Sequence, residues 1–241
     1  MSFAKINKKK MDAKLEDRKE KLKNNYKNVL ENFTKAKNLS KYKNKKTLLL
    51  AVSKKRSWED IKVIYDEGQR IFGENYPQEL IAKSKQLPND IEWHLIGHLQ
   101  SNKVKKLLEA IPNLIIESVD RADIVEKINN CASKDNKTKV YIEVNISGES
   151  TKTGCEQKDI FTIAEQIIKS PRLELVGIMS LGNVGNEKEF EKMIKIKEEI
   201  CEKYSLDKEK FITSFGTSQD FEDAIKSGSD EVRVGHQIFE V

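Results

Sequence analysis

The amino-acid sequence predicts an α/β fold, a (β/α)8 barrel of the TIM type, and two features of the chain support this prediction. A charged amphipathic helix comes first, and strand-like and helical segments then alternate to the end. The strand-like runs are residues 47–53, 70–73, 92–97, 114–119, 140–145, 173–180, 210–215 and 231–234. Such alternation indicates a parallel sheet, and eight strand–helix units close most naturally into a barrel.

The N-terminal helix is expected over residues 13–37, where apolar side chains recur on one face. That face consists of Leu22, Tyr26, Val29, Leu30 and Phe33. The sequence ends at Val241, directly after the eighth strand, so no helix is expected there and the N-terminal helix is the candidate to cover the gap. We therefore expect residues 1–241 to form a single domain, with a charged helical extension over 1–45 and the barrel over 46–241, because no linker or low-complexity segment separates them.

Local signals mark the ends of several helices between the strands. Ser57 followed by Asp60 resembles a capping box, and Gly68 stands where a helix C-cap is expected. Asp120, with Asp123 three residues later, is expected to open a helix that runs to about residue 131. Residues 186–204 form a long helical pattern.

Composition argues against several classes of protein. Of the 241 residues 34% are charged, and 44 basic residues against 39 acidic ones give a net charge of only +5. Charges of both signs are interspersed, which is typical of solvated helix faces rather than a nucleic-acid groove. No apolar run is long enough for a membrane span, and the lysine-rich N-terminus lacks the apolar core of a signal peptide. Three cysteines without metal-ligand spacing indicate a reducing compartment, so we expect the cytoplasm.

Lys54 is the first candidate for chemistry. It directly follows an apolar run, residues 48–53, that reads as a buried strand. A lysine there can project its amine into a shielded pocket, where partial desolvation lowers its pKa and lets it form a Schiff base with a carbonyl compound. Lysines at strand ends are usually solvated, so the weight of Lys54 depends on the residues that accompany it.

The loops after the seventh and eighth strands carry a second signal. In such barrels the working residues lie at the carboxyl ends of the strands, and a phosphate site is commonly built from the last two loops. Ser214, Gly216 and Ser218 supply hydroxyls and a permissive glycine just before a predicted helix. Gly235 and His236 form a second small turn. The alternative is structural, with Ser218 as a helix N-cap and Gly216 as a turn residue.

Other polar residues at strand ends allow more than one interpretation. Arg233 lies inside the eighth strand, and a buried guanidinium needs an acceptor, either a ligand atom or a core carboxylate. His94 and His98 are four residues apart, but neither a cysteine nor a clear carboxylate cluster joins them, so no metal site is expected. A Ser-His-Asp triad lacks its nucleophile-elbow signature. Residues 102–106 are basic, which fits a solvated helical turn better than an anion site.

Several short segments, taken together and in order, resemble one family. They are AVSK at 51–54, FGEN at 72–75, EWHLIG at 92–97, LQSNK at 99–103 and VRVG at 232–235, extended by residues 145–147, 152–154 and 214–218. Each segment alone is unspecific, but the combination is similar to the pyridoxal 5′-phosphate (PLP) homeostasis proteins from about residue 48 to residue 239.

This resemblance implies a fold-type III PLP-binding barrel like the N-terminal domain of alanine racemase. It implies that Lys54 holds PLP as a Schiff base and that Arg233 faces the pyridine nitrogen. It also implies phosphate contacts from Ser214, Gly216, Ser218, Gly235 and His236, and further contacts with or near the cofactor from Asn75, His94, Met179 and Ser180.

The sequence departs from the family pattern at four positions. His98 replaces a usual proline, Thr217 a usual methionine, His236 a usual threonine or similar small residue, and Glu240 a usual glycine. His236 matters most, because a hydroxyl donor to phosphate is lost. Its backbone N–H remains, and a protonated imidazole could compensate.

Two functions are compatible with the resemblance. In the first, the protein buffers or delivers PLP without robust catalysis, and PLP-dependent apo-enzymes are candidate recipients. In the second, it is an amino-acid racemase or a related PLP enzyme. We favour the first, because racemisation in related barrels needs a tyrosine from an additional β-domain, and because an arginine does not keep the ring nitrogen protonated. Residual PLP-type activity stays compatible with it, and we expect a monomer or weak homodimer with no nucleic-acid or membrane partner.

Overall fold

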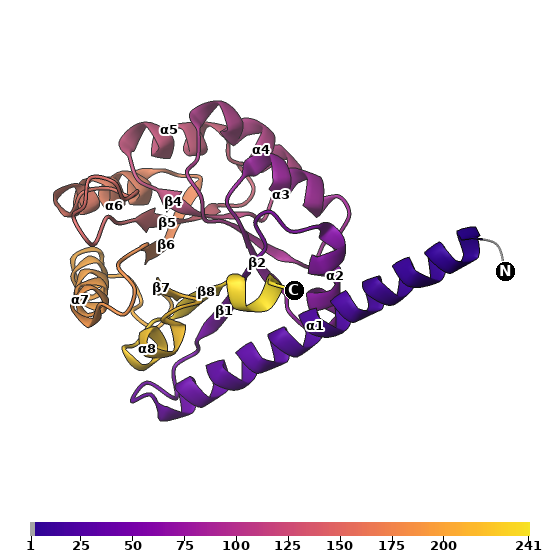
Figure 1. The fold of residues 1–241 in the computed structure, drawn as a ribbon. Coiled ribbons are helices and arrows are strands. Elements are labelled where there is room, and N and C mark those ends of the chain that lie inside the picture. Colours follow the sequence, from indigo (N-terminus) through magenta and orange to yellow (C-terminus); the bar gives the residue numbers. More distant parts are fainter. Residues whose placement is uncertain (1–2) are drawn as a thin grey trace.

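A computed structural model describes residues 3–241, with side chains from residue 11 onward, and shows a closed barrel of eight parallel strands (Figure 1). The strands are β1 Leu48–Val52, β2 Ile71–Glu74, β3 Glu92–Leu95, β4 Ile115–Val119, β5 Thr138–Glu143, β6 Leu173–Met179, β7 Ile212–Thr217 and β8 Glu231–Val234. Each strand pairs with the next one in the chain, and β8 pairs with β1 to close the ring. The predicted barrel is confirmed, with strand ends shifted by a few residues at most.

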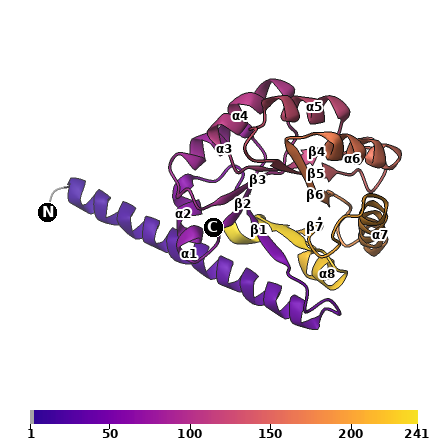
Figure 2. The same cartoon turned by 180° about the vertical axis from the view of Figure 1, so that it is seen from behind.

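Helices surround the barrel, as both views of the ribbon show (Figures 1 and 2). They are α1 Phe3–Leu39, α2 Trp58–Asp66, α3 Pro77–Ser84, α4 Val104–Ala110, α5 Ala122–Cys131, α6 Ile160–Lys169, α7 Glu187–Tyr204, α8 Phe221–Lys226 and α9 His236–Phe239. Short 3-10 turns, Ser101–Lys103 and Gln157–Asp159, precede α4 and α6. None of the helices described between residues 3 and 241 has the length and hydrophobicity to cross a membrane.

Helix α1 takes the place in the outer layer that a long helix after β8 would otherwise fill. It packs against α8, α9 and α2, and its start projects beyond the barrel (Figure 1). Leu22, Tyr26 and Val29 of the predicted face are buried. The helix is longer than predicted, and the expectation that no helix follows β8 was wrong, because the single turn of α9 fits beside α1.

Capping predictions were partly right. The Ser57 hydroxyl accepts a hydrogen bond from the Asp60 backbone N–H at 3.2 Å, as a capping residue does. Gly68 follows α2 with a φ of +107°, a left-handed value that favours glycine. Asp120 does not cap α5, because its carboxylate accepts instead from the Arg121 guanidinium at 2.7 Å and the helix starts at Ala122.

Alternation along the strands divides the side chains between two layers. Most apolar side chains face outward and pack under the helices in one continuous core. A small second cluster, Ile115, Tyr141 and Met179, packs separately from this core. Charged side chains from β2, β3, β4, β5 and β8 are also buried, namely Glu74, His94, Glu117, Glu143, Glu231 and Arg233. Burying these charges without partners would be costly, so their contacts define the chemistry of the region below the strand ends.

Candidate functional site

A pocket of about 790 Å³ opens at the carboxyl ends of the strands. Its wall includes six of the residues proposed from the sequence: Lys54, Asn75, Ser218, Arg233, Gly235 and His236. They come from the loops after β1, β2, β7 and β8 and from β8 itself, which meet at one end of the barrel because the strands are parallel. Apolar side chains, among them Val52, Ile96 and Leu181, complete the wall.

Lys54 stands at the mouth of this pocket. The buried strand ends at Val52, Ser53 is still fully buried, and Lys54 is the first exposed residue. The Lys54 side chain is therefore more exposed than the sequence predicted, although it lines the pocket. Lys54 Nζ has no hydrogen-bond or ion-pair partner among the side chains described from residue 11 onward.

Arg233 forms part of the pocket wall and is only 3% exposed. Its Nη1 donates to Ser214 Oγ at 2.5 Å and its Nη2 donates to the Ser180 carbonyl at 2.6 Å. Neither acceptor is a core carboxylate, which was one of the two acceptors considered from the sequence, and the link to a carboxylate is indirect. The Ser214 hydroxyl donates a hydrogen bond to Glu231 Oε1 at 2.7 Å. The Arg233 guanidinium is thus held in place by its hydrogen bonds to Ser214 and Ser180.

Five of the proposed residues do not line this pocket. Ser214 and Ser180 are buried behind Arg233, and Met179 packs against Ile115 and Tyr141. Gly216 has a φ of +94°, and an added Cβ there would lie 2.3 Å from the Ala224 side chain, so a glycine is required for the turn. His94 lies deeper in the barrel. The residues that do not line the pocket are therefore His94, Met179, Ser180, Ser214 and Gly216.

The last two loops are bonded to each other. Ser218 Oγ accepts a hydrogen bond from the Gly235 backbone N–H at 3.1 Å, so Ser218 is not the N-cap of α8; that position belongs to Asp220. An added Cβ at Gly235 would lie 2.8 Å from the Val52 carbonyl oxygen, which explains the need for glycine where β8 leaves the sheet beside β1.

His236 and Glu240, two of the departures from the family pattern, contact each other. His236 Nε2 contacts the Glu240 carboxylate across the single turn of α9. The side chain of His236 is 73% exposed. The Glu240 carbonyl in turn accepts from the Asn25 side-chain amide at 3.0 Å, which ties this turn to α1. The imidazole therefore points along α9 at the pocket mouth.

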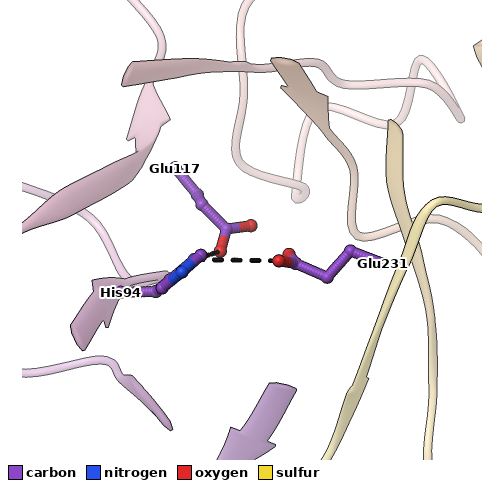
Figure 3. A group of neighbouring side chains, drawn as sticks. All are labelled: His94, Glu117 and Glu231. Carbon is purple, nitrogen blue, oxygen red and sulfur yellow. Dashed lines mark hydrogen bonds and ion pairs between the residues drawn. The ribbon is translucent and has the colours of Figure 1, made fainter. Parts of the chain in front are cut away.

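Sequence reasoning missed the carboxylates that surround His94 inside the barrel (Figure 3). His94 Nδ1 lies 2.6 Å from Glu117 Oε1 and 3.8 Å from Glu231 Oε2. His94 Nε2 lies 3.3 Å from Glu92 Oε1. The expectation that no carboxylate cluster joins His94 was therefore wrong, whereas His98 lies apart from it, half exposed and near Asp120. A glutamate in the middle of an apolar strand was the available signal.

The charges of this cluster nearly balance. Burial lowers the pKa of His94, but the carboxylates of Glu231, Glu117 and Glu92 outweigh it and raise that pKa to about 10, so the imidazole is protonated near neutral pH. Burial raises the pKa of Glu231 to about 8. Glu117 has its pKa lowered, because its bond to His94 and the charge of that ring outweigh its burial. One potential ligand atom from each of the three lies within 4.8 Å of the others.

Comparison with known proteins places this architecture in a family. The profile described as alanine racemase, N-terminal domain, matches residues 25–241. The pyridoxal phosphate homeostasis protein of Mus musculus is 39% identical over 207 residues, which cover 79% of this chain and 75% of the mouse protein. A protein of Bifidobacterium adolescentis has a crystal structure with a TM-score of 0.82 at 32% identity, over 92% of this chain and 96% of that one.

A second solved structure is that of PipY from Synechococcus elongatus, which was determined with PLP bound. It superposes with a TM-score of 0.72 at 30% identity and covers 80% of this chain and 92% of that one. The identity and coverage of these relatives, together with the barrel and its strand-end pocket, establish that the chain belongs to the pyridoxal phosphate homeostasis protein family.

Proposed function

We propose that this protein binds PLP in the strand-end pocket, holds it as a Schiff base on Lys54, and serves intracellular PLP homeostasis without robust catalysis. The observation that carries the proposal is the placement of one unpartnered lysine amine, Lys54 Nζ, in the same pocket as Arg233 and the bonded Ser218–Gly235 loops. When bound, PLP supplies an aldehyde that condenses reversibly with amines, which suits both storage and transfer.

The residues present fit such a ligand. Asn75 Oδ1 is buried and has no hydrogen-bond partner among the described residues, although Asn75 lines the pocket, so a donor from a ligand would satisfy it. Ser218 Oγ accepts from Gly235, and its own hydroxyl hydrogen goes to no described residue, so it can donate to a phosphate oxygen. We assign the phosphate end to Ser218, Gly235 and the backbone of His236.

Arg233 is assigned to the ring nitrogen of the ligand. A guanidinium has donors and no acceptor, so it bonds to an unprotonated nitrogen and leaves the ring a weak electron sink. Ser214 and Ser180 hold Arg233 in place rather than touching the ligand. These assignments favour a carrier over a racemase. Among the described pocket residues, the imidazole of His236 is the one candidate for a second base, and it is paired with Glu240 at the mouth.

Lys54→Ala is expected to abolish covalent attachment of PLP while the fold survives, because the Lys54 side chain is exposed rather than part of the core. The measurement is the near-visible absorption band of the protein with PLP, followed by borohydride reduction and peptide mapping. Lys85→Ala is the matched control, since Lys85 is an exposed lysine just after α3 and should leave attachment intact. A borohydride-trapped adduct in Lys54→Ala would contradict the assignment.

The carrier and enzyme alternatives are separated by turnover. The PLP-loaded protein, incubated with L-alanine, is expected to form D-alanine no faster than free PLP under the same conditions. Formation of D-alanine that depends on Lys54 would instead assign it to the racemases.

A further inference from the structure

A largely buried cluster of charged side chains forms hydrogen bonds with the residues on both sides of Lys54. At its centre is Lys83 of α3, whose side chain is only 9% exposed. Its ammonium group lies 2.9 Å from the Ser53 carbonyl oxygen, 2.7 Å from Glu74 Oε1 and 2.9 Å from Glu79 Oε2. An ammonium group has three donors, so all of them are used. We call Lys83, Glu74 and Glu79 the Lys83 cluster.

The two carboxylates of the Lys83 cluster add further hydrogen bonds to the residues that flank Lys54. Glu74 Oε1 also accepts from the Ser53 hydroxyl at 2.6 Å, and Glu79 Oε2 accepts from the Lys55 backbone N–H at 2.9 Å. Ser53 and Lys55 are the immediate neighbours of Lys54. The chain is therefore held before and after Lys54, while Lys54 itself remains unbonded.

The backbone conformation at Lys55 indicates that the hydrogen bonds of the Lys83 cluster constrain the chain next to Lys54. Lys55 has a φ of +60°, one of two non-glycine residues in the left-handed region among those described. A lysine adopts that conformation rarely and only where surrounding contacts enforce it. The bond from Lys55 N–H to Glu79 is such a contact, and it turns the chain sharply just after Lys54.

Electrostatics hold the cluster together. Burial raises the pKa of Glu74 although bonds from Lys83 and Ser53 oppose the rise. For Glu79, bonds from Lys83 and from the Lys55 N–H outweigh a smaller burial and lower the pKa. Removal of Lys83 would leave the Glu74 carboxylate buried beside Ser53 without a cation, so Lys83 is required to keep both acids in place.

We propose that Lys83, Glu74 and Glu79 are positioning residues for Lys54, which fix its two flanking peptides and so present its amine to the pocket. This rests on the proposed function of Lys54 as the attachment point. The two lysines have opposite roles: Lys83 is buried, bonded through all three donors and unreactive toward carbonyl compounds, whereas Lys54 is exposed and unpaired. PLP added to the protein should therefore never attach to Lys83.

The test combines a measurement without PLP and one with it. Hydrogen exchange of the Lys55 amide is expected to be slow in the wild-type protein and at least tenfold faster in Glu79→Ala, which deletes the acceptor. Glu79→Gln keeps an acceptor oxygen and should retain the protection. The same Glu79→Ala variant should bind PLP roughly tenfold more weakly, with the reduced adduct still on Lys54. Lys85→Met, at an exposed lysine just after α3, is the control and should change neither quantity.

Lys83→Met addresses the centre of the cluster and should also speed exchange at Lys55 and weaken PLP binding. Because that variant is at risk of misfolding, Glu79→Ala, at a side chain that is 34% exposed, decides the outcome if Lys83→Met does not fold. Fast exchange at Lys55 with unchanged PLP affinity would overturn the positioning role. Unchanged exchange in Glu79→Ala would show that the Glu79 carboxylate does not hold the Lys55 amide. A wild-type protein that traps no PLP on Lys54 would overturn the proposed function, and the exchange rates would still decide whether the Lys83 cluster constrains the backbone at Lys55.

Discussion

Ser214 and Arg233 act as one unit at the scale of single residues. The Ser214 hydroxyl accepts from Arg233 and donates to Glu231, so its single hydrogen is committed inside the protein. The resemblance implied a phosphate contact for Ser214; in the structure its hydroxyl connects Arg233 of the pocket wall to the buried carboxylate of Glu231. Its effect on a ligand is then transmitted through the position of Arg233.

Arg233→Ala and Ser214→Ala are both expected to weaken retention of PLP, with the larger loss in Arg233→Ala. Removal of a hydrogen bond to a charged group costs about 1.5–3 kcal/mol, which corresponds to at least a tenfold loss of affinity for Arg233→Ala. Ser214→Ala should lose less, because the Ser180 carbonyl still holds the guanidinium. Equilibrium dialysis of PLP checks both, with Ser227→Ala as a control outside the pocket. Unchanged affinity in both variants would remove this pair from the site.

At the scale of elements, polar side chains of α1 from Arg18 onward bond helix α1 to the barrel and its first outer helix, α2. Arg18 makes a double hydrogen bond with Asp60 of α2, at 2.9 and 2.7 Å. Tyr26 donates to the Gln69 side chain at 3.0 Å, and Gln69 in turn donates to the Leu49 carbonyl of β1. The extension predicted over residues 1–45 is therefore tied to the first strand of the barrel through a buried polar chain.

Leu22→Ala is expected to lower the free energy of unfolding by about 2–5 kcal/mol, because Leu22 is fully buried between α1 and the barrel. Leu15→Ala is the matched control on the same helix, since Leu15 is 48% exposed and its truncation should cost less than about 0.5 kcal/mol. Urea denaturation measures both. Equal effects would mean that α1 does not dock as described and that residues 1–45 are not part of one domain with the barrel.

The elements show what the sequence could and could not predict. Strands and long helices were predictable because hydrophobic periodicity is a local signal. The turn α9 was not, since four residues carry no periodicity. Asp120 has the right residue type for a cap, but a neighbouring arginine competes for its carboxylate.

The site divides in the same way. Strand-end residues such as Lys54 and Ser218 were predictable, because parallel topology brings strand ends together. The contacts of Glu117 and Glu231 were not predictable, because they depend on which side chains of β3, β4 and β8 face the same interior layer. That is a property of the closed sheet rather than of any segment.

At the scale of the whole molecule, the buried acids make stability depend on pH. Burial raises the pKa of Glu231 to about 8 and that of Glu143 to about 7, both from an ordinary value of 4.5. Between pH 5 and 6.5 the folded protein therefore holds more protons on these groups than the unfolded chain does. Stability should fall as pH rises through this window, by up to about 1.4 kcal/mol per pH unit for each group.

Glu231→Gln is expected to flatten this pH dependence, because glutamine has the shape of the protonated acid and an oxygen that can still accept from Ser214. The check is the free energy of unfolding at pH 5 and at pH 6.5 in both proteins. Glu143→Gln should remove the other contribution independently, and Glu109→Gln, at an exposed acid, should leave the slope as it is. An unchanged slope in both of the first two variants would overturn the assignment to these acids and would leave His94, whose pKa is raised to about 10, as the group that takes up protons on folding.

Closure of the ring through β1 and β8 sets the order in which a newly made chain can finish folding. Leu49 pairs with Val232, and about 180 residues of synthesis separate the two strands. At ribosomal speeds that is roughly 10–40 seconds, during which the free edge of β1 can pair with the wrong strand or with another chain. Arg233 lies in β8 and Gly235 directly follows it. Pairing of β8 with β1 therefore covers the last free strand edge of the barrel and completes the strand-end pocket in a single step.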